Sequence, residues 1–133
     1  MIFYYDLLIR EHHLDSYGHV NNATYLEIFE EARWEVVTER GYGYNKVHET
    51  GLGPVILEIN IKFLKEVTLR EKVKISVEAE PFNGKVAWIK QKLLKEDGSI
   101  GSEIALLYGF FDLNNRKLVV PTTEWLKAVG LSN

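Results

Sequence analysis

The hydrophobic residues of this chain recur with two different periods, and the change of period divides the sequence into elements. Residues 2–11 are aromatic, aliphatic or β-branched, with Phe3, Tyr5 and Leu7 on one face, which predicts a first strand. Residues 12–21 are polar and centre on Gly18, which predicts a loop. From there to Arg40 the apolar positions follow a helical period without an internal glycine or proline.

The helix is expected to begin at Asn21 or Asn22, because asparagine side chains accept hydrogen bonds from the first free amides of a helix. Arg40 and Gly41 form a typical helix end. The apolar stripe between these limits is broad, as expected for a helix that lies on a sheet. It comprises Tyr25, Leu26, Ile28, Phe29, Ala32, Val36 and Val37.

After Pro54 the hydrophobic period becomes two, which predicts strands at residues 55–63, 73–80, 86–95, 100–113 and 117–120. In the first of these, one face is expected to carry Val55, Leu57, Ile59, Ile61 and Phe63, and the other Glu58, Asn60 and Lys62. The glycine-rich residues 41–54 predict a loop with one short helical turn. Residues 121–129 predict a terminal helix.

Residues 104–111 are apolar on both faces, so this strand is expected near the centre of the sheet. The order of elements predicts an α+β fold: an antiparallel curled sheet of five or six strands wrapped round one long central helix, in a single domain of residues 1–133. One helix buries only one face of such a sheet. The other face and the sheet edge would stay uncovered in a single chain. We therefore predict at least a homodimer.

Composition narrows the class of protein. The chain has 133 residues, 46% hydrophobic and 26% charged, with a net charge of -3 and no long basic run, so we expect no nucleic-acid partner. It has no cysteine, which excludes disulfides, cysteine-ligated zinc and a cysteine nucleophile. Neither a secretory signal nor a membrane-spanning apolar run is found, so a cytoplasmic protein without stable membrane association is expected.

The loop before the helix concentrates the residues that carry chemistry. Asp15, Gly18 and His19 precede Asn21 and Asn22. Such a loop places titratable side chains beside the unpaired N–H groups of a helix N-terminus. A carboxylate that attacks or activates water, next to donors for an oxyanion, is the chemistry of an acyl-transfer site.

Other chemistries find less support in the sequence. Four possible metal ligands lie close together in the sequence: His12, His13, Asp15 and His19. Their spacing matches no strong zinc motif, so no bound metal is expected. No Gly-x-Ser-x-Gly motif indicates a serine triad. The glycines of residues 41–53 match neither a Walker nor a dinucleotide motif.

Residues 13–27 and 30–34 resemble the hotdog-fold acyl-CoA thioesterases of the 4-hydroxybenzoyl-CoA thioesterase class. The likeness is greatest to their long-chain acyl-CoA thioesterase III branch. The signature of that family is an aspartate, two variable residues, usually a glycine, then His-Val-Asn-Asn, a tyrosine and an acidic-Ala-Arg step. The matching residues are Asp15, Gly18, His19, Val20, Asn21, Asn22, Tyr25, Glu31, Ala32 and Arg33.

This resemblance implies a hotdog enzyme of lipid metabolism that hydrolyses fatty acyl-CoA, of medium or long chain, to free acid and coenzyme A. It implies no cofactor, and active sites at the interface of a homodimer or homotetramer. It also implies that Asp15 is the nucleophile or general base and that the backbone N–H of Asn22 is the oxyanion donor. For His19, three functional roles stay open: orienting the carboxylate, binding the carbonyl side of the substrate, or assisting proton transfer. The alternative is a purely structural hydrogen-bonding role.

Five further residues are assigned to substrate binding: Gly18, Asn21, Tyr25, Asn60 and Lys62. Lys62, Lys65, Arg70 and Lys85 are candidates for contact with the phosphates of coenzyme A, or are simply solvated. Three other functions stay open: an acyl-acyl carrier protein thioesterase, a noncatalytic acyl-binding hotdog dimer, and a hotdog dehydratase. The dehydratase fits less well because its histidine and acidic residue come from the central helix, whereas the histidines here precede it.

Overall fold

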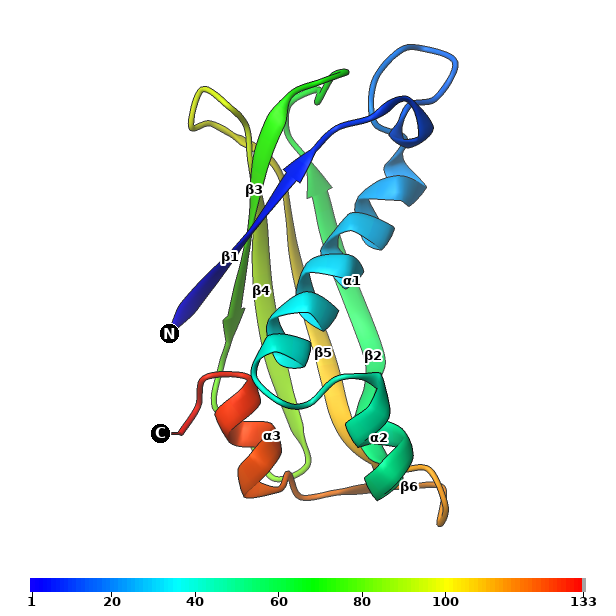
Figure 1. Cartoon of the computed structure of the whole chain (residues 1–133), viewed down its shortest axis with the longest axis vertical. Helices are drawn as coiled ribbons and strands as arrows, with labels where there is room; N and C mark the ends of the chain where they lie inside the picture. Colours follow the sequence, from blue (N-terminus) through cyan, green and yellow to red (C-terminus); the bar gives the residue numbers. More distant parts are fainter. Residues whose placement is uncertain (133) are drawn as a thin grey trace.

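A computed structural model describes residues 1–132 and shows one antiparallel sheet with a long helix on one face (Figure 1). Five strands follow the order β1-β3-β4-β5-β2, and β6 pairs with the end of β5. The α+β prediction, with five or six strands, is therefore confirmed. The strands are β1 Ile2–Leu8, β2 Leu52–Phe63, β3 Lys72–Ala79, β4 Val86–Leu94, β5 Ile100–Asp112 and β6 Lys117–Val119.

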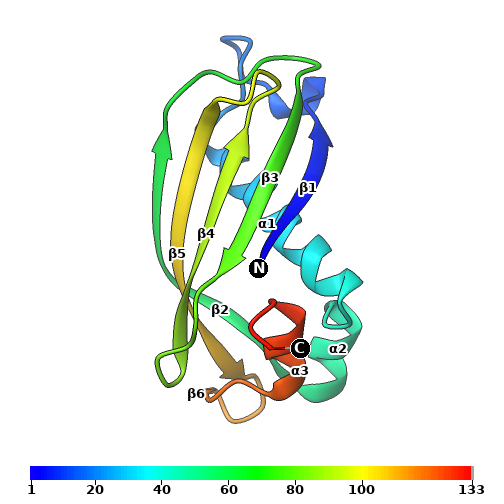
Figure 2. The same ribbon diagram turned by 90° about the vertical axis from the view of Figure 1, so that its left-hand side faces the viewer.

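The central helix α1 spans Asn22–Glu39 and packs against β1 and β3. Two short helices, α2 at Tyr44–Thr50 and α3 at Thr123–Ala128, lie together near the C-terminal end of α1 (Figure 2). The same view shows that the opposite face of the sheet carries no helix. In the described part of the chain, no helix is long and apolar enough to cross a membrane.

The core forms where the apolar stripe of α1 meets the sheet. Phe29 and Ala32 are completely buried, and four further stripe residues are also buried: Tyr25, Ile28, Val36 and Val37. Leu26, which was expected to widen the stripe, is instead 37% exposed. It therefore lies outside the buried face of α1.

The prediction of a central strand at residues 104–111 is confirmed, since β5 pairs with β4 on one side and β2 on the other. Its alternate residues Ile104, Leu106, Tyr108 and Phe110 are buried in the core. The residues between them point to the outer face. There Ala105, Leu107 and Phe111 are only half-buried.

The predicted faces of the second strand are wrong at one end, because β2 contains a bulge. The pairing with β5 shifts between Ile56 and Glu58, which leaves Leu57 without an opposite residue. A bulge reverses the alternation of side chains. As a result Val55 points to the outer face, whereas Ile59, Ile61 and Phe63 share the core face as predicted. Glu58, Asn60 and Lys62 lie on the outer face, also as predicted.

Two other element boundaries differ from the predictions. The predicted loop at residues 41–54 contains two helical turns, α2, because Gly43 precedes it in an extended conformation and Gly51 ends it with a φ of 71°. The first strand stops at Leu8 rather than near Glu11, and a single 3₁₀ turn, η1 at Glu11–His13, follows it.

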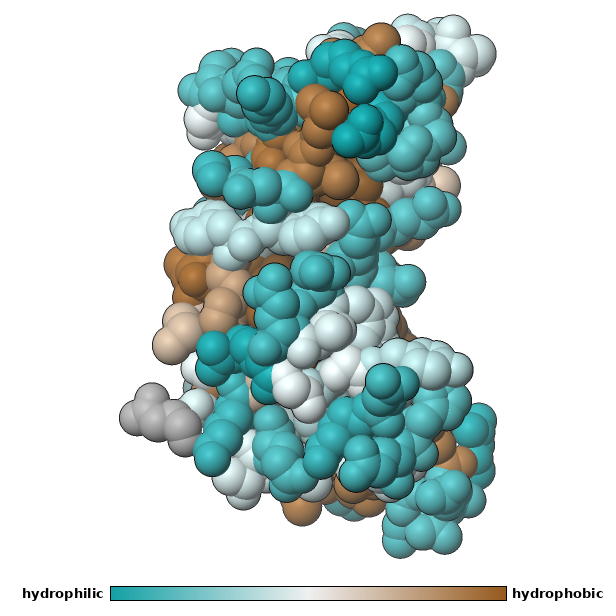
Figure 3. All heavy atoms as spheres, in the orientation of Figure 1, coloured by the Kyte–Doolittle hydropathy of each residue, from teal (hydrophilic) through white to brown (hydrophobic). Residues whose placement is uncertain are grey.

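Strand β2 forms a long free edge of the sheet. It has 12 residues, and β5 is its only partner strand in residues 1–132. Ile56, Leu57, Ile59 and Phe63 are all at least 39% exposed. By contrast, the helix-covered face in Figure 3 is largely hydrophilic, with hydrophobic atoms gathered mainly in its upper half.

Candidate active site

A tight turn holds Asp15 and His19 next to each other ahead of α1. The Asp15 N–H donates to the His19 carbonyl at 3.1 Å, and the Gly18 N–H donates to the Asp15 carbonyl at 3.1 Å. Gly18 adopts a φ of 86°, a left-handed conformation that strains any residue with a Cβ. A Cβ at this position would meet nothing within 4 Å, so steric crowding does not explain the glycine. The positive φ alone favours it.

The two oxygens of the Asp15 carboxylate have different surroundings. Oδ1 accepts a hydrogen bond from the Tyr17 N–H at 2.9 Å. Oδ2 lies 4.0 Å from His19 Nδ1, too far for a direct hydrogen bond. Both side chains are partly exposed, at 23% and 34%. The turn therefore fixes the direction of the carboxylate, and Oδ2 accepts no hydrogen bond within residues 1–132.

The loop is attached to the rest of the protein by backbone hydrogen bonds. The Val20 N–H donates to the Val67 carbonyl at 2.9 Å, in the segment between β2 and β3. On the other side, the Asn21 N–H donates to the His13 carbonyl at 3.4 Å. His13 is itself buried, and its Nδ1 accepts a hydrogen bond from the Arg10 N–H at 2.9 Å. Burial lowers the pKa of the His13 imidazole, and the nearby His12 lowers it further.

Helix α1 begins at Asn22, with Asn21 as its N-cap residue. The expected side-chain cap is not formed: Asn21 makes no capping hydrogen bond, and only its carbonyl accepts from the helix, from Thr24 N–H at 2.9 Å and Tyr25 N–H at 3.3 Å. Within residues 1–132, the Asn22 N–H has no protein acceptor. It is thus a free donor at the positive end of the helix dipole.

Most of the predicted site residues line one open depression of about 500 Å³. Residues that the sequence predicted and that line it are Asp15, His19, Asn21, Asn22 and Tyr25. Residues that sequence reasoning did not assign to the site are Tyr17, Val20, Phe63, Leu64 and Glu66. Lys65, one of the candidates for phosphate contact, also lines it.

Phe63 is the most informative of the residues that the sequence analysis missed. Its ring lies 5.3 Å from that of Tyr25, yet its side chain is 51% exposed at the end of β2. Tyr25 is buried, and burial raises the pKa of its hydroxyl, so it packs as a neutral group at neutral pH. Alternating hydrophobicity predicted only that Phe63 faces the core. It could not show that this strand end meets the Asp15 loop.

Asn60 and Lys62 lie elsewhere. Both point to the outer face of the sheet, where they line a separate depression of about 210 Å³ together with Lys90, Lys92 and Glu103. The Lys62 ammonium lies 4.0 Å from a Glu103 carboxylate oxygen. Within one chain, therefore, the structure does not bring these two residues to the depression that contains Asp15.

A family model described as the thioesterase-like superfamily matches residues 9–129, a range that includes the whole loop and helix described above. The chain belongs to the thioesterase-like superfamily. The resemblance inferred from the motif of residues 13–27, the hotdog fold and the prediction of a thioester hydrolase are confirmed at this level.

Known relatives agree with this assignment. The chain is 31% identical to the long-chain acyl-CoA thioesterase FadM of Escherichia coli over 110 residues, which is 82% of this chain and 83% of FadM. The crystal structure of YbaW, a probable thioesterase of Escherichia coli, superimposes with a TM-score of 0.83 at 26% identity and covers 96% of both chains.

A second structure, of the Staphylococcus aureus protein SAV2348 in complex with CoA, has a TM-score of 0.87. It covers 100% of this chain and 87% of SAV2348, at 16% identity. That likeness shows a shared fold.

Proposed function

We propose that this protein is an acyl-CoA thioesterase that hydrolyses medium- or long-chain fatty acyl-CoA to the free acid and coenzyme A. The observation that carries the proposal is that Asp15 and Asn22, whose N–H has no acceptor in residues 1–132, line one depression. The relation to FadM, a long-chain acyl-CoA thioesterase, favours fatty chains.

Asp15 supplies the reacting carboxylate. Its Oδ2 either attacks the thioester carbon, forming an anhydride that water then hydrolyses, or removes a proton from water as water attacks that carbon. In both routes the carbon–sulfur bond breaks, one water is consumed, and a proton goes to the departing thiolate. The Tyr17 N–H bond to Oδ1 holds the carboxylate in a single orientation for either step.

The Asn22 N–H is the proposed donor to the oxyanion that forms on the former carbonyl oxygen. It is unpaired in the described chain and lies in the first turn of an 18-residue helix, where the dipole also favours negative charge. His19, beside Oδ2, is proposed as a positioning residue for the carboxylate. Gly18 is proposed to act only through the turn that it permits.

A second copy of the chain is proposed to complete the site. Phe63 belongs both to the exposed edge of β2 and to the depression that contains Asp15. A partner that pairs with the β2 edge would therefore contact the depression and cover the exposed apolar residues of the strand. Lys65, which lines the depression, is proposed to attract the phosphates of coenzyme A. Asn60 and Lys62 are proposed to contact substrate only in such an assembly.

The proposal is tested by measuring thiol release from short-chain, long-chain and aromatic acyl-CoA by wild type and by Asp15→Asn. We expect release from fatty acyl-CoA by wild type and its loss in the variant. Release only from acyl-acyl carrier protein would identify the alternative carrier. Binding of acyl-CoA without release from any carrier would show a noncatalytic acyl-binding protein and overturn the proposal.

A further inference from the structure

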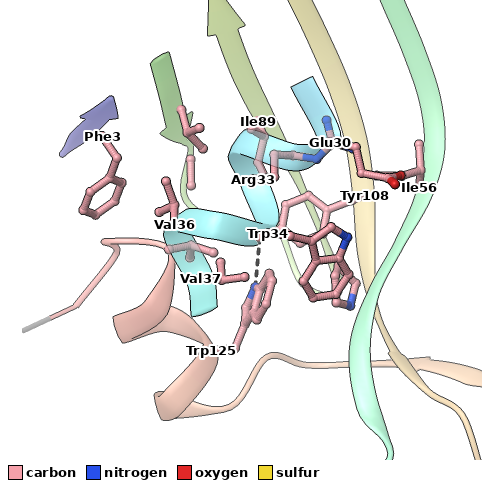
Figure 4. Close-up of a pocket in the computed structure, with 14 residues that line it drawn as sticks. Phe3, Glu30, Arg33, Trp34, Val36, Val37, Ile56, Ile89, Tyr108 and Trp125 are labelled. Carbon is pink, nitrogen blue, oxygen red and sulfur yellow. Dashed lines mark hydrogen bonds between the residues drawn. The ribbon is translucent and has the colours of Figure 1, made fainter. Parts of the chain in front are cut away.

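A second cavity, separate from the depression around Asp15, lies between α1 and the sheet. Its volume is about 130 Å³, and most of its lining is apolar (Figure 4). Side chains from β1, α1, β3 and α3 close most of it, while Pro54 and Ile56 of the β2 edge line it as well. Ile56 is 39% exposed, so this side of the cavity lies near solvent.

One cation lines this apolar cavity. The Arg33 side chain extends from α1 toward the cavity (Figure 4), and its Nη1 donates to Gln91 Oε1 at 2.9 Å. Gln91 is 1% exposed and is fixed in turn by donating from Nε2 to the Phe29 carbonyl at 3.0 Å. Burial lowers the pKa of Arg33, but a guanidinium remains protonated near neutral pH.

The guanidinium has donors to spare. A guanidinium carries five N–H donors, and the Gln91 bond is the one hydrogen bond that Arg33 makes to other side chains in residues 1–132. No carboxylate there lies within ion-pair distance of it. The side chain is half-buried, and none of its nitrogens is a buried atom without a hydrogen-bond partner, so the remaining N–H groups are open to solvent. These groups can donate to a ligand that brings an acceptor into the cavity.

Tyr108 adds a second donor to the same cavity. Its side chain is completely buried, and its hydroxyl oxygen accepts a hydrogen bond from Trp125 Nε1 at 3.0 Å. The hydroxyl hydrogen itself has no acceptor among the hydrogen bonds of residues 1–132. Figure 4 shows Tyr108 and Arg33 approaching the space between helix and sheet from opposite elements, β5 and α1.

The charges around the cavity select the kind of acceptor. The carboxylate of Glu30, an exposed residue of α1, also lines the cavity and raises the pKa of Arg33. Its negative charge disfavours a second carboxylate beside the guanidinium. A neutral oxygen, such as an oxo or hydroxyl group, would take the free donors without this repulsion.

We infer that the cavity is a subsite for an acyl chain that carries a neutral oxygen, with Arg33 and Tyr108 as the donors that recognise it. The assignment of the ligand as an acyl chain rests on the proposed function. Arg33 lies 11 residues beyond Asn22 in the same helix, or about 16 Å along its axis. The recognised oxygen is therefore remote from the thioester handled by the Asp15 loop of the same chain.

Binding to this cavity can be measured without hydrolysis, because Trp34 and Trp125 line it. The third tryptophan, Trp88, precedes the lining residue Ile89 on β4 and therefore points to the opposite, outer face. In the variant Trp88→Phe, the two remaining tryptophans both line the cavity and report on it by fluorescence. In this background, a medium-chain methyl ketone and the alkane with the same number of carbons are titrated into the protein.

We expect Arg33→Met to weaken ketone binding about tenfold or more, the effect of losing a hydrogen bond to a charged group, and to leave alkane binding nearly unchanged. Tyr108→Phe, a smaller change, is expected to weaken ketone binding selectively but less. Lys72→Met, which removes an exposed cation of β3 outside both depressions and the cavity, is the matched control and should change neither. Equal losses for ketone and alkane, or no binding of either, would overturn the subsite.

The enzymatic arm compares kcat/KM for an oxo-fatty acyl-CoA and the plain acyl-CoA of equal chain length. Arg33→Met should lower the ratio of kcat/KM for the oxo substrate to kcat/KM for the plain substrate about tenfold. The change should come mainly from a higher KM for the oxo substrate. An unchanged ratio would overturn the assignment to acyl chains. If no thioester is cleaved but the ketone preference depends on Arg33, the proposed function fails while the subsite stands.

Discussion

The Asp15 carboxylate faces the His19 imidazole across one turn, with Oδ2 4.0 Å from Nδ1, while Oδ1 is held by the Tyr17 N–H at 2.9 Å. One oxygen is thus used to fix the side chain and the other stays free. The free Asn22 N–H lines the same depression. In the proposed mechanism, Oδ1 positions the carboxylate and Oδ2 is the reacting oxygen.

Asp15→Asn is expected to lower kcat by about 10²–10⁴-fold, the usual contribution of a positioned acid or base. Asn keeps an acceptor for the Tyr17 N–H, so the fold should survive. Asp97→Asn is the matched control, because Asp97 Oδ1 also accepts from the N–H two residues on, that of Ser99, at 2.9 Å. Steady-state kinetics with thermal unfolding check both variants. Equal activity loss in the two would refute a chemical role for Asp15.

The oxyanion assignment predicts different effects of two substitutions at Asn22. Asn22→Ala retains the backbone N–H and should cost less activity than Asp15→Asn. Asn22→Pro removes that N–H and should lower kcat by about 10²–10³-fold. Proline is tolerated at the first helical position, and Asn21, with φ -68° and ψ 144°, already has a conformation suited to precede it.

Circular dichroism would verify that α1 is intact in the proline variant. An alanine variant as inactive as Asp15→Asn, with its fold preserved, would show that the Asn22 side chain rather than its backbone is required.

His13 predicts an acid-sensitive fold. Burial lowers its folded-state pKa below the value of the unfolded chain. The unfolded state therefore takes up the proton first, and the free energy of unfolding falls as the pH drops below about 6.5. His13→Gln keeps an acceptor for the Arg10 N–H but cannot be protonated. Between about pH 7.5 and pH 5, the melting temperature of the variant should fall less than that of wild type.

The exposed His48 provides the comparison for this measurement. His48→Gln should retain the wild-type pH dependence. An identical pH dependence in wild type and His13→Gln would assign the acid sensitivity to other groups.

The β2 edge is expected to mediate self-association. We predict that wild type is a dimer or larger at micromolar concentration by size exclusion with light scattering. Ile59→Lys places a charge on the exposed edge strand, where Ile59 is 43% exposed, and should shift the protein toward monomer with a loss of activity. Ile2→Lys, at a 47% exposed residue of the opposite edge strand, should not. A monomeric, active wild type would contradict a shared site.

The sequence alone was sufficient to predict the strands, the long helix and the residues of the Asp15 loop, because these depend on local periodicity and on a motif of neighbouring residues. The bulge at Leu57 could not be predicted, since an extra residue in a strand is defined only by its pairing with β5. For the same reason the sequence assigned Val55 to the wrong face.

Only the tertiary structure decided which distant residues meet. Phe63 joins the Asp15 loop because β2 ends there, whereas Asn60 and Lys62, three residues and one residue earlier, point to the outer face. Arg33 and Tyr108 are 75 positions apart in the chain, and they line one cavity because α1 packs on the core face of the sheet, where Tyr108 is buried. The order of residues determines local elements, but long-range packing determines which side chains share a site.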